Sequence, residues 1–140
     1  MRYWDASALV SLCVAEEPTG ALRRLAGGGI VTWSVSAVEI ASAIERRARE
    51  GSLEPAERRA ARVALGELAA AWAEIDALGA VRERALRLVA THPLRAADAM
   101  QLAAALVAVR DRPGGHVFVC MDDRLRDAAA REGFVVLPES

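Results

Sequence analysis

The sequence predicts an α/β fold, a three-layer α/β/α sandwich whose helices cover both faces of a central parallel sheet of about five strands. Short β-branched or aromatic runs alternate with longer segments of helical pattern along the 140 residues. Hydrophobic residues make up 54 % of the chain, which is enough for a sizeable core. The length fits one domain, residues 1–140. Strands that alternate with helices are typical of parallel sheets covered on both faces.

The strands are predicted from apolar runs that lie between turn signals. Most are rich in valine, isoleucine or aromatic residues, the types that favour strands. The third run has the weakest pattern. The predicted strands are Tyr3–Asp5, Ile30–Trp33, Glu74–Leu78, His116–Cys120 and Phe134–Leu137.

The helices are predicted between these strands, and glycine marks several of their ends. The triple glycine at 27–29, Gly51 and Gly133 each follow a segment of helical pattern. Ser34 or Ser36 is the expected N-cap of the third helix. The predicted helices are Ala6–Ala15, Pro18 to the triple glycine, Ser36–Glu50, Glu54–Trp72, Ala80–Ala90, Leu94–Arg110 and Asp123–Arg131.

Charge and composition exclude several classes of protein. All 18 basic residues are arginine, so P-loop ATPases and phospho-acceptor domains that need a lysine are excluded. A net charge of −1 permits a nucleic-acid partner without demanding one. No apolar run approaches the roughly 18 residues of a membrane span, and no signal-peptide pattern opens the sequence. Cys13 and Cys120 lack metal-ligand spacing, so we expect reduced thiols in a cytoplasmic protein with no membrane partner.

Four carboxylates are candidate site residues because the predicted topology brings them to one edge of the sheet. Asp5 closes the first strand and Asp122 follows the fourth, while Glu39 and Asp98 lie near the starts of helices. The carboxyl ends of parallel strands and the amino ends of the following helices meet at this edge. Each acid also has a structural interpretation, as a helix cap or as a charge that the helix dipole stabilises. Glu39 and Asp98, however, stand in apolar segments, where burying an unpartnered carboxylate is unfavourable.

A cluster of four carboxylates predicts a divalent cation. Negative charges within several Å of one another repel strongly and hold protons unless a cation lies among them. Ligands that are all oxygen select a hard ion such as Mg²⁺ or Mn²⁺. Such an ion activates water for in-line attack on phosphorus, so the cluster predicts phosphodiester hydrolysis.

Four segments resemble those of a known family. Their order and spacing fit over essentially the whole chain, and the first and third are the most specific. The segments are Tyr3–Val10 (YWDASALV), Ser36–Glu39 (SAVE), Leu94–Ala105 (LRAADAMQLAAA) and Val117–Leu125 (VFVCMDDRL). In these segments the chain is similar to PIN-domain ribonucleases, specifically the VapC-type toxins of bacterial toxin–antitoxin pairs.

The resemblance implies a single PIN domain in which the first and fourth strands are neighbours. It also implies that an acidic quartet binds Mg²⁺ or Mn²⁺ and hydrolyses RNA. The quartet would be Asp5, Glu39, Asp98 and Asp122. Homodimerisation and inhibition by a small cognate antitoxin of the VapB type are further expectations.

Three positions beside the quartet bear on this resemblance. Family members commonly carry threonine or serine where this chain has Cys120, so a weak thiol replaces a hydroxyl next to the site. Asp122 is followed by Asp123, and Asp122 is preferred because it keeps the register of the segment. Ser7, two residues after Asp5, matches the family's small hydroxyl residue and is expected to orient water or a metal ligand.

Two arginines are candidate contacts for RNA. Arg46 lies seven residues after Glu39, on the same helical face about 10 Å further along, where it could reach a phosphate. An ion pair with Glu50 is an equally good interpretation of Arg46. Arg95, three residues before Asp98, could balance the charge of the quartet. Two other functions stay open: a catalytically weak PIN domain that acts as a binding or assembly module, and a housekeeping PIN nuclease.

Overall fold

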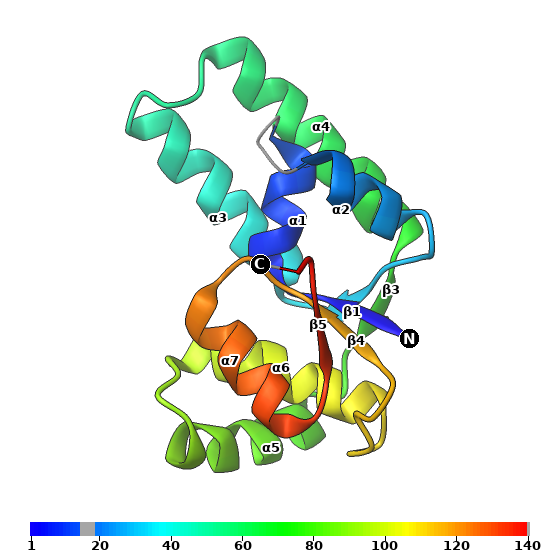
Figure 1. Cartoon of the computed structure of the whole chain (residues 1–140). Coiled ribbons are helices and arrows are strands. Elements are labelled where there is room, and N and C mark those ends of the chain that lie inside the picture. The colour runs from blue at the N-terminus through cyan, green and yellow to red at the C-terminus, as the bar shows by residue number, and fades with distance from the viewer. Residues whose placement is uncertain (15–18, 140) are drawn as a thin grey trace.

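The centre of the molecule is one parallel sheet (Figure 1). In the computed structural model, which describes residues 1–14 and 19–139, five strands of three residues each pair in the order β3-β2-β1-β4-β5. The strands are β1 (Arg2–Trp4), β2 (Val31–Trp33), β3 (Ala73–Ile75), β4 (Val117–Val119) and β5 (Val135–Leu137). The predicted parallel sheet of about five strands is therefore confirmed.

The order of the strands reverses next to β1. The chain adds β2 and β3 on one side of β1 and then crosses to add β4 and β5 on the other. Tyr3 is aligned with Val31 of β2 on one side and with Phe118 of β4 on the other. The expected contact between the first and fourth strands is thus confirmed, and the switch point lies between β1 and β4.

Seven helices in the described residues form the two outer layers (Figure 1). They are α1 (Ala6–Cys13), α2 (Thr19–Ala26), α3 (Ser36–Arg49), α4 (Pro55–Ala71), α5 (Leu78–Thr91), α6 (Ala96–Ala108) and α7 (Asp123–Glu132). Helices α1 to α4 cover one face of the sheet and α5 to α7 cover the other. None of the helices in the described part of the chain is long and apolar enough to span a membrane.

Each face of the sheet has its own core. Tyr3 and Phe118 pack with α5, α6 and α7, whereas the next residues, Trp4 and Val119, pack with α1, α3 and α4. Successive side chains of a strand point to opposite faces, so a run of apolar residues supplies both cores. All four of these side chains are completely buried, which confirms the expected three-layer sandwich.

The structure differs from the sequence predictions mainly at the ends of elements. The third strand is Ala73–Ile75 and not Glu74–Leu78, and Leu78 already begins α5. This strand pairs with β2 alone and is largely exposed, so it lacks the alternating pattern of a half-buried strand. The predicted start of α2 at Pro18 and the end of α1 at Ala15 lie outside the described residues.

The N-cap of α3 and the start of α6 also differ from the prediction. Neither Ser34 nor Ser36 is the N-cap of α3; Val35 occupies that position and makes no side-chain cap. The hydroxyl of Ser36 is instead buried, 2.7 Å from the hydroxyl of Thr32. Helix α6 begins at Ala96 with Arg95 as its N-cap, two residues later than the predicted start at Leu94. Gly133, by contrast, ends α7 as predicted, with a positive φ of 113°.

Candidate active site

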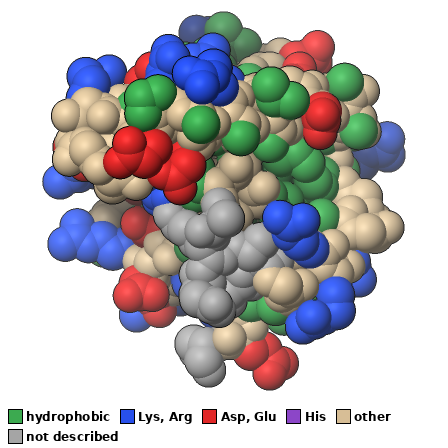
Figure 2. Space-filling model, turned by 90° about the horizontal axis from the view of Figure 1, so that it is seen from above, with side chains coloured by type: hydrophobic (Ala, Val, Ile, Leu, Met, Phe, Trp, Pro, Cys, Tyr) green, Lys and Arg blue, Asp and Glu red, His purple; other side chains and the backbone are tan. Residues whose placement is uncertain are grey.

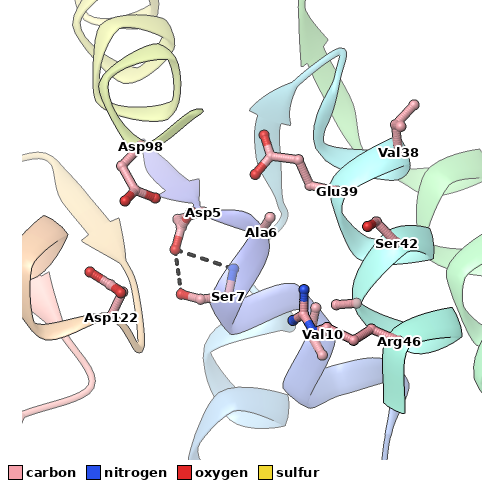
Figure 3. A pocket seen from close by; sticks show the side chains of 11 residues that line it. Asp5, Ala6, Ser7, Val10, Val38, Glu39, Ser42, Arg46, Asp98 and Asp122 are labelled. Atoms are coloured by element: carbon pink, nitrogen blue, oxygen red, sulfur yellow. Dashed lines mark hydrogen bonds between the residues drawn. The ribbon is translucent and has the colours of Figure 1, made fainter. Parts of the chain in front are cut away.

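All four predicted carboxylates line one cleft of about 450 Å³. Asp5 directly follows β1, and Asp122 lies between β4 and α7. Glu39 and Asp98 lie in the first turns of α3 and α6. Figure 3 shows Asp5 in the middle, with Asp98 and Asp122 on one side and Glu39 on the other. Residues that are far apart in the sequence therefore meet at the switch point between β1 and β4.

Asp5 is the buried member of the group and is held by three hydrogen bonds. Its side chain is 3 % exposed and caps the amino end of α1. Its Oδ2 accepts from the Ser7 backbone N–H at 3.2 Å, from the Ser7 hydroxyl, and from the Cys120 thiol at 3.2 Å. Burial raises the pKa of Asp5 to about 6, although the hydrogen bonds from Ser7 and Cys120 oppose the shift.

Ser7 and Cys120 connect the segment that follows β1 to the segment that follows β4. The Ser7 hydroxyl accepts from the Met121 backbone N–H at 3.0 Å while it donates to Asp5. The Cys120 sulfur accepts from the Asp122 backbone N–H at 3.3 Å. Burial and the charge of Asp5 hold the pKa of the Cys120 thiol far above its usual value, so it stays a neutral donor. Both residues hold Oδ2 of Asp5, and Ser7 also lines the cleft.

Glu39 is half-buried and is held by the Gln101 side chain, which donates to Oε1 at 3.0 Å. Loss of hydration is the largest effect on Glu39 and raises its pKa to about 7. The hydrogen bond from Gln101 lowers this pKa, whereas the charges of Asp5 and Asp98 raise it further.

Asp98 and Asp122 lie at the more open side of the cleft. Partial burial and then the charge of Asp122 raise the pKa of Asp98, while Arg95 opposes the shift. Asp122 is exposed and caps α7, since its Oδ1 accepts from the Leu125 N–H at 2.9 Å. The adjacent Asp123 is also exposed but does not line the cleft, so of this pair the structure places Asp122 in the site.

The chemistry of these donors fits a hard divalent cation. All four are carboxylates. Asp5, Glu39 and Asp98 have raised pKa values, because burial removes their hydration and because neighbouring carboxylates repel their charge. No ion pair joins any of the four to a basic side chain within residues 1–14 and 19–139. Their arrangement is open, because no three His, Cys, Asp or Glu side chains of the described residues stand close enough to hold one ion together.

The two predicted RNA contacts lie at different sides of the acids. Arg46 lines the same cleft, beside Val10 in Figure 3, and makes no ion pair with Glu50 or any other described residue. Arg95 lines a second hollow of about 290 Å³ that shares Asp98 and Asp122 with the cleft. Arginines also lie in separate clusters, interspersed with acids, over the face seen in Figure 2.

Two residues of the site were missed from the sequence. Arg124 lines the second hollow together with Arg95. Gln101 is completely buried and contacts Glu39. A signal for Gln101 was present, since it is the single polar residue in the apolar run from Ala99 to Ala108 and follows Asp98 by three positions. A polar side chain in such a run needs a buried partner.

The comparison with protein families agrees with this architecture. The model of the PIN domain matches residues 2–131. The chain belongs to the PIN-domain family. No curated protein matches the sequence. PIN domains are generally nucleases and typically use divalent metals, so family membership supports a hydrolase that acts on nucleic acid.

Proposed function

We propose that this PIN domain is a metal-dependent endoribonuclease and the toxin of a VapBC-type toxin–antitoxin pair. Asp5, Glu39, Asp98 and Asp122 would hold Mg²⁺ or Mn²⁺. The observation that carries the proposal is the meeting of these four carboxylates in one cleft without a paired basic side chain among the described residues. Carboxylates that repel one another in the metal-free protein are typical of a site that a bound cation completes.

A bound Mg²⁺ or Mn²⁺ supplies Lewis-acid activation of both the water and the phosphate. The protein supplies positioning and proton transfer. Ser7 and Cys120 hold Oδ2 of Asp5, which leaves its other oxygen for the cleft. Glu39 uses Oε1 to accept from Gln101, and its Oε2 is available to orient water and take its proton.

The RNA strand would cross the acids between two basic positions. Arg46 would contact a phosphate on the side of α3, and Arg95 would contact one on the side of α6. Arg124 stands beside Arg95 and would add to the second contact. Each arginine neutralises a phosphate without reading sequence, so the contacts contribute affinity and orientation.

The toxin assignment rests on the four segments quoted above, which also support a homodimer and a VapB-type antitoxin as partners. Its test is growth. Expression of the chain should arrest growth, and co-expression of the antitoxin encoded beside it should relieve the arrest. Growth arrest that persists in Asp98→Asn would contradict the assignment, because arrest would not then depend on cleavage.

The biochemical test is cleavage of purified cellular RNA by the antitoxin-free protein. The wild type should yield discrete fragments with Mg²⁺ or Mn²⁺ and none with chelator, and Asp98→Asn should yield none. Asp123→Asn is the matched control, because Asp123 is an exposed acid outside the cleft. Equal activity of wild type and Asp98→Asn would refute the site.

A second candidate function is a binding or assembly module with little catalysis. The open arrangement of the carboxylates and the thiol at position 120 favour it. Titration with Mn²⁺ separates the two functions, since a folded protein that binds no Mn²⁺ with all four acids present supports the module.

A further inference from the structure

A buried polar chain runs beneath the cleft and ends on Glu39. Tyr3 of β1, Thr32 of β2, Ser36 of α3 and Gln101 of α6 are each completely buried. The Tyr3 hydroxyl donates to Oε1 of Gln101 at 2.6 Å, and Nε2 of Gln101 donates to the Ser36 hydroxyl at 2.9 Å and to Glu39 at 3.0 Å. The amide therefore connects elements on both faces of the sheet to one acid of the site.

The hydrogens of this polar chain can be assigned because each hydrogen is used in one hydrogen bond. The Thr32 hydroxyl donates to the Trp4 carbonyl at 2.7 Å, so in its 2.7 Å contact with Ser36 it accepts. Ser36 therefore uses its only hydrogen on Thr32 and must accept from Gln101. The direction of the chain is set by the Trp4 carbonyl, which can only accept.

The Tyr3 hydroxyl determines the orientation of the amide. Burial and the charge of Asp5 hold the pKa of Tyr3 well above its usual value, so the hydroxyl keeps its proton. It donates that proton to the Gln101 oxygen, which leaves the NH₂ group to face Ser36 and Glu39. A flipped amide would place its oxygen against the Glu39 carboxylate, and two acceptors would then face each other.

We propose that Gln101 is the positioning residue for Glu39: its amide, oriented by Tyr3 and Ser36, holds Oε1 and thereby turns Oε2 towards the cleft. The inference deepens the proposed function, because it assigns the support on which the proton-accepting role of Glu39 rests. Partners of this kind around metal ligands commonly change metal affinity or activity by about 10- to 100-fold when they are removed.

The test compares Gln101→Met with Leu106→Ala. Methionine keeps the length of the side chain and removes the N–H donor. Leu106 is a buried residue of the same helix outside the polar chain, so its truncation controls for loss of stability. Tyr3→Phe is a second variant, in which Gln101 remains but its amide is free to turn.

The first measurement needs no metal and no substrate. The ¹³Cδ resonance of Glu39, assigned with Glu39→Gln, is recorded in metal-free protein labelled at glutamate. At a pH well above 7, where the Glu39 carboxylate is ionised in every variant, we expect Gln101→Met to change its position, Tyr3→Phe to change it less, and Leu106→Ala to leave it unchanged. An unmoved resonance in folded Gln101→Met, or in folded Tyr3→Phe if the first variant does not fold, overturns the inference.

The second measurement is Mn²⁺ affinity by electron paramagnetic resonance. We expect Gln101→Met to weaken binding about 10- to 100-fold in the wild type and to have no further effect in Glu39→Gln. Additive losses would overturn the inference, because Gln101 would then act by another route. If the wild type binds no Mn²⁺, the metal-dependent function fails while the Glu39 resonance still decides the role of Gln101.

Discussion

The acids of the cleft and two acids at the other end of the strands have opposite electrostatic surroundings in this molecule. Asp5 follows β1, is buried without a basic partner among the described residues, and has a pKa raised to about 6. Asp111 precedes β4 and receives two hydrogen bonds from the Arg84 guanidinium, at 2.8 and 2.7 Å, which lower its pKa. The same residue type is therefore destabilised as a carboxylate at one end of the sheet and stabilised at the other.

Glu132 and Glu39 show the same contrast. Glu132, just before β5, accepts from Arg87 at 2.8 Å and lies 2.7 Å from Nε2 of His92, and its pKa is lowered. Glu39 has only a neutral amide and neighbouring negative charges, and its pKa is about 7. The chain has 18 arginines for 19 acids, yet within the described residues no arginine forms an ion pair with the acids of the cleft. Such a difference is expected if the acids of the cleft serve the proposed activity and the paired acids serve stability.

The largest expected effect is loss of cleavage in Asp5→Asn. Removing the buried charge should lower RNA cleavage by about 1,000-fold or more, which corresponds to about 4 kcal/mol of activation free energy. The thermal midpoint should stay equal or rise, because asparagine is as good an N-cap as aspartate and carries no charge to bury. Cleavage assays and thermal unfolding on the same samples measure both. A loss of activity that accompanies a large loss of stability would break the distinction between the two groups.

Glu132→Ala should have the opposite effect. Truncation leaves Arg87 and the buried His92 without their acceptor and should lower the free energy of unfolding by about 2–3 kcal/mol. RNA cleavage per folded molecule should not change. Asp127→Ala is the matched control on the same helix, because Asp127 and Arg131 form an exposed pair that contributes under about 0.5 kcal/mol. Chemical denaturation should therefore separate these two variants clearly.

Stability should fall as pH rises from 5 to 8 in metal-free protein. The pKa values of Asp5 and Glu39, about 6 and about 7, lie above the value near 4 of unfolded carboxyls. The folded state therefore binds these protons more tightly, and the stability they contribute is lost as pH passes through 6 to 7. We expect a loss of about 1–2 kcal/mol, after allowance for the partial exposure of Glu39.

The controls for this pH effect come from both groups of acids. The paired acids Asp111 and Glu132 have lowered pKa values, so their contribution is lost only towards pH 4 and below. In an Asp5→Asn, Glu39→Gln double variant the fall between pH 5 and 8 should largely disappear. If thermal unfolding shows the same slope in the double variant, the slope has its origin elsewhere in the molecule.

The sequence was sufficient to predict the sheet and the place of the four acids, because both depend on topology. Parallel strands bring their carboxyl ends to one edge whatever the exact limits of each strand. Helix starts were less predictable. Ser36 has the residue type of an N-cap, but its hydroxyl is engaged with Thr32 and Gln101 in the core, a tertiary contact that local pattern does not contain.

The electrostatic state of the acids could not be predicted either. Local sequence places Asp98 among apolar residues and Asp111 between two arginines, but it does not contain the partner of Asp111, which is Arg84, 27 positions away. Arg95 is three residues from Asp98, and it weakens the pKa shift of Asp98 without forming an ion pair. The distances between side chains on different helices decide these outcomes, and only the packed structure supplies them.

The smallest expected effect on cleavage is that of replacing Cys120, whose thiol contacts Asp5. The thiol donates to Asp5 at 3.2 Å and accepts from the Asp122 N–H at 3.3 Å. A hydroxyl at this position could make the same two contacts, but the hydrogen bonds of the thiol are longer and weaker. Cys120→Ser should change cleavage by about 2- to 5-fold, less than about 1 kcal/mol, whereas Cys120→Ala removes the donor to Asp5 and should reduce cleavage more. Steady-state kinetics on one RNA substrate measure both. If the wild type is inactive and Cys120→Ser cleaves RNA, the thiol is what makes this PIN domain a weak enzyme, and the unpaired acids would retain a site whose support has been lost.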